Sequence, residues 1–428
     1  MNRNRFLQSL GMVSGGLLVA RPGLAYSNPE EFSKALSGAV DDKDFWKKVR
    51  EQFIFPDDYM YFNTGGIGAV PQVVLDMVQK SNIENEEYPK PGHDEARWLQ
   101  VKKTCAPFFG PTVLPEEVSL VSTATEGINI ILNGLMFKPG DEVITTYHEH
   151  VALNLPLLNH VNIHGIVVKS IEPDTQSAAA NVEAIRKLVT PRTRLIFLSH
   201  ITTTTGQVLP VAEIGKLAQD MKILFAVDGA QALGAMPMDV KSLGIDFYVA
   251  SGHKWIVGPK RTGLLYISHE KRDLVHPMTI GAYSEMENDL KKGSLKFRDS
   301  GQRYEYGTQN EALFFGLERG AQFIQAIGIE KVYAHDRLLA EKFCDGIAKI
   351  PDMELLSPTE EPYRSALITF RHKTKDYMEI ANHLTGKKRM RVRVVPEAGL
   401  NAVRVSFHVY NQEFEVERLL EEIRKYVG

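Results

Sequence analysis

The stretch Ile223–Lys254 reads ILFAVDGAQALGAMPMDVKSLGIDFYVASGHK, and it is the most informative part of the sequence about the fold. It holds two short apolar runs, residues 223–227 and 247–250, and polar residues follow each run at once. Apolar runs of this length without polar alternation are typical of strands buried on both faces of a sheet. Ligands of open α/β sheets gather at the carboxyl ends of the strands, so Asp228 and Lys254 are expected at one edge.

Further apolar runs flank this stretch and alternate with helical patterns. In residues 126–137, for example, Ile128, Ile131, Leu132 and Leu135 recur at helix spacing. The alternation predicts an α/β domain with a mostly parallel sheet. The other expected strands are Val118–Val121, Glu142–Thr145, Gly165–Ser170, Leu195–Ser199 and Gly263–Ile267.

Polar side chains also follow other strands of the expected sheet, and together they suit a pyridine cofactor that carries a phosphate. An Asp beside a ring nitrogen keeps that nitrogen protonated, and a Lys amine can bond covalently to a carbonyl group of the cofactor. The amine needs a pocket that lowers its pKa from about 10.4 before it can act as a base. Thr125 is expected where the 126–137 helix starts, and helix N-termini bind phosphate.

Residues 226–254 resemble the signature of class V aminotransferase-fold enzymes, a pyridoxal-phosphate family with cysteine desulfurases, aminotransferases and isopenicillin N epimerases. The resemblance implies that Lys254 holds the cofactor as a Schiff base and that Asp228 pairs with the pyridine nitrogen. For the rest of the cofactor site it implies Gln231 at the ring hydroxyl, His150 on the ring face, and Ser251, His253, Ala124 and Thr125 at the phosphate.

The resemblance extends beyond the lysine, over most of residues 60–428. It implies that Thr308 reaches the phosphate of a partner subunit, that Arg404 binds the substrate carboxylate, and that Asn63 lies near that carboxylate. It therefore implies a homodimer with a type I pyridoxal-phosphate transferase fold. That fold has a large domain with a mostly parallel seven-stranded sheet and a small C-terminal α+β domain.

Two departures from the desulfurase pattern narrow the expected reaction. Residues 391–399 contain no cysteine where desulfurases carry their nucleophile, and Cys105 and Cys344 are elsewhere. Thr203 stands where desulfurases often place an asparagine, and its surroundings are similar to the isopenicillin N epimerase-like branch; it is expected near the ring hydroxyl. Epimerisation is thus expected first, transamination second and carbon–sulfur cleavage third. The alternative outside enzymology is a regulatory or vestigial protein that binds pyridoxal phosphate.

Several other polar residues can be explained either by a structural role or by a functional one. Arg391 and Arg393 could bind a second anionic group of a substrate, but a solvated strand face is the favoured interpretation. His148 and His200 are expected to be structural, because no closed set of zinc ligands accompanies them. No metal site is expected.

The composition is that of a soluble globular protein: 428 residues, 43% hydrophobic, 24% charged and a net charge of −3. This charge does not indicate nucleic acid or a membrane surface as a partner. The expected partner is a small amino-acid substrate. Residues 1–27 resemble a twin-arginine export signal in which Asn4 separates the arginines, which predicts export to the periplasm. The expected organisation is signal 1–27, N-terminal segment 28–60, large domain 61–310 and small domain 311–428, with a long loop at 271–303.

Overall fold

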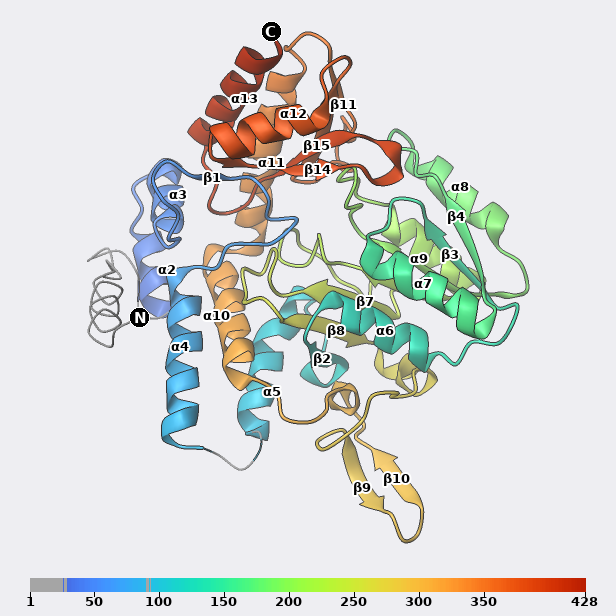
Figure 1. Cartoon of the computed structure of the whole chain (residues 1–428). Coiled ribbons are helices and arrows are strands. Elements are labelled where there is room, and N and C mark those ends of the chain that lie inside the picture. Colours follow the sequence, from blue (N-terminus) through green and yellow to red (C-terminus); the bar gives the residue numbers. More distant parts are fainter. Residues whose placement is uncertain (1–25, 27–28, 90–91, 93) are drawn as a thin grey trace, which may run out of the picture.

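The computed structural model describes residue 26 and residues 29–89, 92 and 94–428 (Figure 1). Except for Tyr26, the predicted export signal lies outside the described residues. Among the residues that are described, no helix combines the length and hydropathy that a membrane span requires.

A seven-stranded sheet forms the centre of the molecule, in the order β2-β8-β7-β6-β5-β3-β4. Strands β7, β6, β5, β3 and β4 pair in parallel, and β8 runs antiparallel to both of its neighbours, β7 and the edge strand β2. The fold class expected from the apolar runs is confirmed, because each predicted run forms one of these strands. Their bounds are β2 Val118–Val121, β3 Glu142–Thr146, β4 Val167–Ile171, β5 Thr193–Ser199, β6 Leu224–Asp228, β7 Phe247–Ser251 and β8 Gly263–Ile267.

Helices cover both faces of this sheet, as its apolar strands require. One face packs against α6 (Ala124–Gly134) and α7 (Val151–His164), where Ile128 and Leu153 are fully buried. The other face packs against α5 (Glu95–Cys105), α8 (Ala178–Leu188), α9 (Val211–Asp220) and α10 (Glu311–Ile327). The sheet therefore exposes its strand ends and not its faces, and these ends carry the polar residues.

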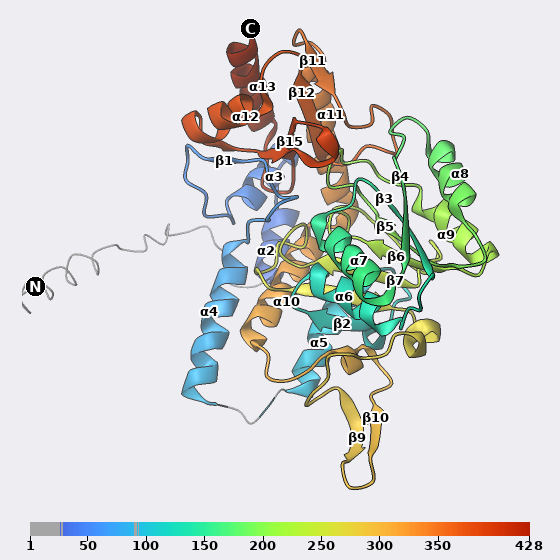
Figure 2. The ribbon, with the colours of Figure 1, turned by 45° about the vertical axis from the view of Figure 1, so that its right-hand side comes forward.

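The C-terminal part of the chain forms a second, smaller layer beside the large domain that contains the central sheet (Figure 2). Its four-stranded sheet has the order β11-β12-β15-β14 and packs against three helices. The bounds are α11 Ile329–Ile347, β11 Met353–Leu355, β12 Leu367–His372, α12 Tyr377–Asn382, β13 Met390–Arg391, β14 Arg393–Val395, β15 Ala402–Ser406 and α13 Glu413–Val427.

Two segments near the predicted domain boundaries join the layers. The N-terminal helices α2 (Pro29–Ser37) and α3 (Asp42–Arg50) pack on the end of α10, and β1 (Met60–Tyr61) pairs in parallel with β13. Helix α10, which the sequence assigned to the small domain, buries Phe314 and Leu317 in the core of the large sheet. Helix α4 (Gln72–Glu87) lies along α10 (Figure 1).

The loop predicted at residues 271–303 is wrong in part. It contains a β-hairpin of β9 (Glu285–Asp289) and β10 (Ser294–Phe297), which projects away from the large domain in both views (Figures 1 and 2). Most of its side chains are exposed, so the hairpin buries no apolar face and leaves no alternating pattern in the sequence. Its strands form through backbone pairing that the composition does not reveal.

Candidate active site

A cavity of about 190 Å³ opens at the carboxyl ends of the central strands. Nine of the predicted site residues line it, brought together from separate strands and loops. They are Ala124, Thr125, His150, Thr203, Asp228, Gln231, Ser251, His253 and Lys254. The other lining residues include Gly65, Gly66, Thr123, Ser199 and Arg393.

Lys254 lies in the turn after β7, and only 9% of its surface is exposed. Burial lowers the pKa of its amine to about 8, and the nearby Arg404 and Arg393 act in the same direction while Asp228 opposes them. A pKa of about 8 leaves roughly a tenth of this amine uncharged at pH 7, far more than at its ordinary pKa. The pocket meets the requirement that the sequence set for a basic lysine.

Asp228 ends β6 on the floor of the pocket, buried to 5% exposure. One carboxyl oxygen accepts the backbone N–H of Ala230 at 2.9 Å. Burial raises the pKa of Asp228, and Lys254 partly offsets this rise. A buried carboxylate without a bonded cation is suited to accept a hydrogen bond from a positively charged ring nitrogen.

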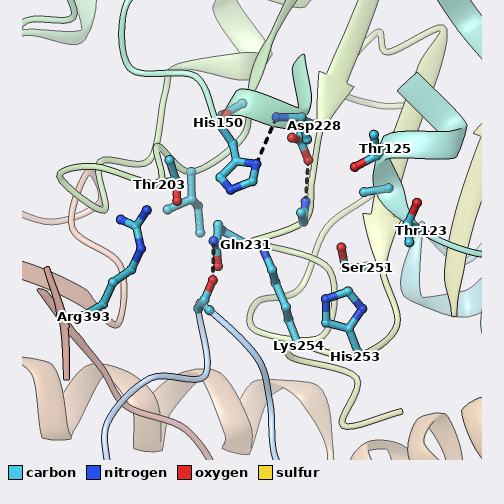
Figure 3. Close-up of a pocket in the computed structure, with 17 residues that line it drawn as sticks. Thr123, Thr125, His150, Thr203, Asp228, Gln231, Ser251, His253, Lys254 and Arg393 are labelled. Atoms are coloured by element: carbon cyan, nitrogen blue, oxygen red, sulfur yellow. Dashed lines mark hydrogen bonds between the residues drawn. The ribbon is translucent and has the colours of Figure 1, made fainter. Parts of the chain in front are cut away.

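A set of donors on one side of Lys254 suits a phosphate (Figure 3). Helix α6 begins at Ala124, and the hydroxyl of Thr123 accepts the backbone N–H of Glu126 at 3.1 Å as its N-cap. The predicted start at Glu126 is therefore two residues late, and Thr125 lies inside the first turn. Ser251 and His253 face the same side, and the buried Nδ1 of His253 has no partner among the described residues.

These observations test whether the residues fit pyridoxal phosphate. The N–H groups at a helix N-terminus and its positive dipole end attract a phosphate, and they lie at one end of the cavity. The buried, unpartnered His253 nitrogen and the buried Asp228 carboxylate leave polar groups to be satisfied by a ligand. The residues present fit the cofactor.

His150 forms the N-cap of α7, and its ring Nδ1 accepts the backbone N–H of Ala152 at 3.1 Å. This bond fixes the ring orientation in the pocket wall. Burial, followed by the charge of Lys254, lowers the pKa of His150 to about 4. The imidazole is therefore neutral at physiological pH, as a group that stacks on a cationic ring should be.

Gln231 and Thr203 line the pocket, but protein groups already occupy their polar atoms. The Gln231 amide donates to the carbonyl of Gly65 at 2.8 Å and accepts the indole N–H of Trp255 at 3.0 Å. The hydroxyl of Thr203 accepts from Nη1 of Arg404 at 3.0 Å. Their expected contacts with a ring hydroxyl stay predictions.

Arg404 lies on β15, with 1% of its surface exposed. Nη1 donates to Thr203, whereas Nε and Nη2 are buried and have no partner among the described residues. A Cβ atom on the pocket residue Gly65 would lie 3.1 Å from Nη2, so the free edge of the guanidinium adjoins the pocket wall. Two parallel free donors match the two oxygens of a carboxylate.

Arg393 is the pocket residue that the sequence interpretation underrated. It lines the cavity on the side of Lys254 away from Ser251 and His253, whereas Arg391 is exposed and does not line it (Figure 3). The two residues do not share one strand, because Arg391 ends β13 and Arg393 begins β14. Arg393 forms an ion pair with Glu397, and its Nη1 is buried without a partner among the described residues.

Arg393 and Arg404 face each other directly in the antiparallel pair of β14 and β15. Like charges opposite each other are unfavourable, and burial together with Arg393 lowers the pKa of Arg404 to about 9. An anionic substrate group between them would relieve this repulsion.

Asn63 and Thr308, also expected at the site, do not line the cavity. Asn63 is buried, forms an isolated bridge with Ser406 of the arginine strand, and lies directly under Gly66 of the pocket wall. Thr308 is exposed and follows the segment after the β9–β10 hairpin. Its expected contact with a partner subunit stays a prediction.

Glu149 is a buried carboxyl that the sequence analysis gave no role. It accepts hydrogen bonds from the hydroxyls of Thr146, at 2.7 Å, and of Ser199, which lines the pocket. Ser199 pairs with Asp228 in the register of β5 and β6, so Glu149 lies beneath the pocket floor. Burial raises the pKa of Glu149 to about 7, with Asp228 acting in the same direction. In the sequence Glu149 lies between His148 and His150, and this local pattern does not indicate that its side chain is buried beneath the pocket.

The neighbouring histidines have structural partners. His148 contacts Glu172 through Nε2 at 2.6 Å and Thr204 through Nδ1 at 2.7 Å. His200 contacts the hydroxyl of Tyr248 at 3.0 Å, and burial lowers its pKa to about 4. Neither lines the cavity.

The two cysteines of the chain lie away from the cavity. Cys105 is fully buried in the large core, and burial raises its pKa well above the ordinary range. Cys344 lies in the core of the C-terminal layer, and burial raises its pKa to about 11. Neither thiol is placed or ionised for attack on a substrate in the pocket.

Known proteins resemble this chain along most of its length, including most of the residues that line the cavity. The profile of the family described as aminotransferase class-V matches residues 70–419. A probable cysteine desulfurase of Pyrococcus abyssi is 27% identical over 388 residues, which cover 87% of this chain and 95% of that protein.

Solved structures agree with this match. The apo cysteine desulfurase of Thermococcus onnurineus NA1 has a TM-score of 0.79 and 26% identity, over 89% of this chain and 98% of that one. The cystine C–S lyase C-DES, solved with its product cysteine persulfide, has a TM-score of 0.77 and 26% identity, over 86% and 98%. A C-DES variant carries glycine covalently linked to its pyridoxal-phosphate cofactor. The predicted cofactor and fold are confirmed; no isopenicillin N epimerase is among these relatives.

Proposed function

Because the chain belongs to the aminotransferase class-V family, we propose that it is a pyridoxal-phosphate enzyme that cleaves a carbon–sulfur bond of an amino acid. The observation that carries this proposal is a buried Lys254, beside Asp228 and near two arginines, in a cavity that no cysteine lines. The relatives suggest sulfur chemistry. Because no cysteine lines the cavity, we favour elimination of the sulfur group over its transfer to a cysteine of the enzyme.

Pyridoxal phosphate, when bound, withdraws electrons from the substrate Cα and so makes the Cα proton removable. Ala124, Thr125, Ser251 and His253 are placed to hold its phosphate, and Asp228 to keep a proton on its ring nitrogen. His150, neutral and fixed by its N-cap bond, is placed to cover the ring.

Lys254 serves as the base that removes the Cα proton. Its pKa of about 8 leaves enough free amine at neutral pH, and the protonated form is acidic enough to return the proton. Burial excludes bulk water from this exchange. The same amine is the covalent attachment point of the cofactor before substrate arrives.

Arg404 orients the substrate by its carboxylate. Its Nη1 is held by Thr203, so the guanidinium plane is fixed and the free Nε and Nη2 present two donors. Arg393 adds a second positive charge on the same side. The Cα is thereby held near Lys254, and the sulfur-bearing side chain points into the remaining space.

Desulfurases that pass sulfur to a cysteine of their own need a reactive thiol, which this pocket lacks. Elimination has no such need, since the sulfur leaves on its own substituent. In balance, R–S–CH₂–CH(NH₂)–COOH plus water gives R–SH, pyruvate and ammonia. The cystine C–S lyase C-DES is one relative that is named for this cleavage chemistry. Epimerisation and transamination, expected first from the sequence, use the same residues and rest on branch resemblance alone.

One experiment separates these reactions. Purified protein is loaded with pyridoxal phosphate, checked for the absorbance of the lysine-bound cofactor, and given single amino acids, including cysteine and cystine, in deuterated water. Elimination yields pyruvate with sulfide, a thiol or a persulfide. Loss of chirality together with deuterium at Cα indicates epimerisation. A released keto acid together with the pyridoxamine form of the cofactor indicates transamination.

The control for this experiment is Lys254→Ala, which should abolish both the lysine-bound absorbance and turnover. A protein that binds the cofactor on Lys254 yet leaves every amino acid unchanged would be the regulatory or vestigial protein instead. Absorbance retained in Lys254→Ala would contradict the site itself.

We also propose a homodimer and export to the periplasm. The dimer is supported by the exposed position of Thr308, outside the cavity of its own chain. Export is supported by the sequence of residues 1–27, with its arginines and apolar run. Cell fractionation with and without Arg3→Lys and Arg5→Lys tests the second proposal.

A further inference from the structure

A buried chain of hydrogen bonds connects the C-terminal layer to two pocket residues. Asp336 on α11 contacts Nδ1 of His408 at 2.9 Å, and Nε2 of His408 contacts the carbonyl oxygen of Trp255 at 2.9 Å. The indole N–H of Trp255 donates to Gln231, whose amide donates to the carbonyl of Gly65. Gln231 and Gly65 line the cavity, and Trp255 directly follows Lys254.

The chain is closed to solvent. His408 and Trp255 are fully buried and Asp336 is 1% exposed. Buried polar groups must find protein partners, and the loss of one leaves another unsatisfied at considerable cost. The nearest titratable neighbours that act on the pair are His335, stacked on Trp46, and Tyr410.

The hydrogen-bond donors and acceptors around His408 and Asp336 determine where the protons of this pair lie. The carbonyl oxygen of Trp255 only accepts, so Nε2 of His408 must carry a hydrogen. Without a second hydrogen, the lone pair of Nδ1 would face a carboxylate oxygen of Asp336. One more proton therefore lies between Nδ1 and Oδ2, and the pair as a whole is neutral. A neutral pair can be buried without an uncompensated charge, and Oδ1 of Asp336 is left buried without a partner among the described residues.

The opposite side of the lysine turn is also held. The N–H of Gly68 donates to the carbonyl of His253 at 2.7 Å, and a Cβ on Gly68 would lie 2.2 Å from the carbonyl oxygen of Lys254. Only a glycine allows this approach of the two backbones. The lysine turn is thus packed by the 63–68 loop on one side and bonded to His408 on the other.

We propose that His408, oriented by Asp336, is a positioning residue for Lys254. It fixes the peptide between Trp255 and Ile256, one residue beyond the lysine, and, through Trp255 and Gln231, the Gly65 segment that adjoins Arg404. Because Asp336 and His408 belong to the C-terminal layer, the position of that layer sets the geometry of base and carboxylate site together. This inference rests on the proposed function for the role of Lys254.

The test replaces the pair by apolar residues in the double variant Asp336→Leu/His408→Met. Exchange of a buried ion pair for apolar side chains often leaves stability intact, so folding is not expected to fail. The first measurement is amide hydrogen exchange of the cofactor-free protein over residues 252–258. We expect exchange there to become at least tenfold faster, with the exchange of the β5 and β6 strands unchanged and the melting temperature lowered only by the loss of the donor to the Trp255 carbonyl oxygen.

The second measurement is steady-state kinetics with an amino acid that the wild-type enzyme converts. We expect kcat to fall at least tenfold, KM to change less than about threefold, and the pH at which kcat/KM rises to shift. A merely structural role would lower the amount of folded enzyme and move neither the KM-to-kcat split nor the pH profile.

Two matched variants serve as controls. His160→Gln changes another buried histidine, bonded to Asn133 away from the cavity, and should leave both measurements unchanged. Asp336→Asn retains a donor toward Nδ1 and should stay within about twofold of wild type. A loss in Asp336→Asn equal to that of the double variant would contradict the hydrogen-bond assignment.

The outcomes separate the inference from the proposed function. Unchanged exchange over residues 252–258, or acceleration spread evenly over the whole chain, overturns the positioning role even if the wild-type enzyme is active. A wild-type protein that turns over no amino acid overturns the proposed function, while the exchange measurement still decides whether His408 holds the lysine turn.

Discussion

At the scale of single residues, the pocket combines two buried carboxyls with three cations. Asp228 and Glu149 lie at and beneath its floor, and Lys254, Arg393 and Arg404 lie around it. Each group changes the proton affinity of the others, because little water is present to screen them. Two of these effects are open to direct measurement.

Glu149 makes the stability of the protein fall as pH rises. Its pKa is about 7 in the folded protein and 4.5 in the unfolded reference, so the folded state binds more protons between these values. Stability from this group is complete below about pH 4.5 and is lost as pH passes about 7, by roughly 3 kcal/mol at most. Denaturant unfolding of the cofactor-free protein at about pH 5 and about pH 8 measures it.

The comparison protein is Glu149→Gln, which keeps the hydrogen bonds to Ser199 and Thr146 but cannot ionise. It should lose less stability over the same pH range than wild type. Equal losses in the two proteins would mean that Glu149 is already charged at pH 5.

Arg393 holds down the pKa of Lys254. In Arg393→Gln one nearby cation is removed, so the protonated amine is favoured and its pKa rises. The acid limb of the pH profile of kcat/KM should move upward by as much as about one pH unit, and KM should rise about tenfold. Arg391→Gln, exposed and outside the cavity, is the matched control and should behave as wild type.

At the scale of elements, helix α6 connects stability with cofactor binding. Thr123 caps its N-terminus, and the first turn of the helix lines the phosphate side of the cavity. The helix is held on its buried face as well, since a Cβ on Gly127 would lie 2.9 Å from Val249 of β7. The position of the N–H groups at the helix start is therefore set by both its cap and its packing.

Thr123→Ala should cost about 1 kcal/mol of stability and also weaken pyridoxal-phosphate binding several-fold. Ser177→Ala removes the equivalent cap of α8, where the Ser177 hydroxyl accepts from the N–H of Ala180. That control should lose similar stability and no cofactor affinity, as measured by thermal melting and cofactor titration. Equal affinity in both variants would separate the α6 cap from the phosphate site.

At the scale of the whole molecule, three parts of the chain meet at one cavity. The central sheet supplies Asp228 and Lys254, the 63–68 loop supplies Gly65 and Gly66, and the C-terminal layer supplies Arg393. The exposed Thr308 is the predicted contribution to a second copy.

The proposed dimer predicts complementation between two defective chains. Lys254→Ala and Thr308→Val should each be impaired alone, the second through about tenfold weaker cofactor binding. A mixed dimer would combine an intact Lys254 with an intact Thr308 in one of its two sites, so the purified mixed dimer should have about half the activity of the wild-type dimer. Sedimentation of the wild type as a monomer with full activity would overturn this arrangement.

The strands of the central sheet and most residues of the candidate site could be predicted from the amino-acid sequence. Strands buried on both faces are mainly apolar, so the inner strands appear as apolar runs, and Asp228 and Lys254 lie at the edge where these strands end; the edge strand β4, VVKSI, is only partly buried. The family resemblance added the residues of the cofactor site, nine of which line one cavity.

Features that depend on contacts between distant segments could not be predicted and became visible in the folded chain. The placement of Arg393 in the cavity and Arg391 outside it follows from a change of strand partner between β13 and β14, which leaves no mark in composition. The exposed β9–β10 hairpin carries no apolar pattern because it buries no face. Glu149 and His408 are single polar residues whose burial and partners, Ser199 and Asp336, lie 50 and 72 positions away. Local sequence specifies periodicity and strand ends, whereas the proton affinity and orientation of a buried group depend on neighbours that only folding brings together.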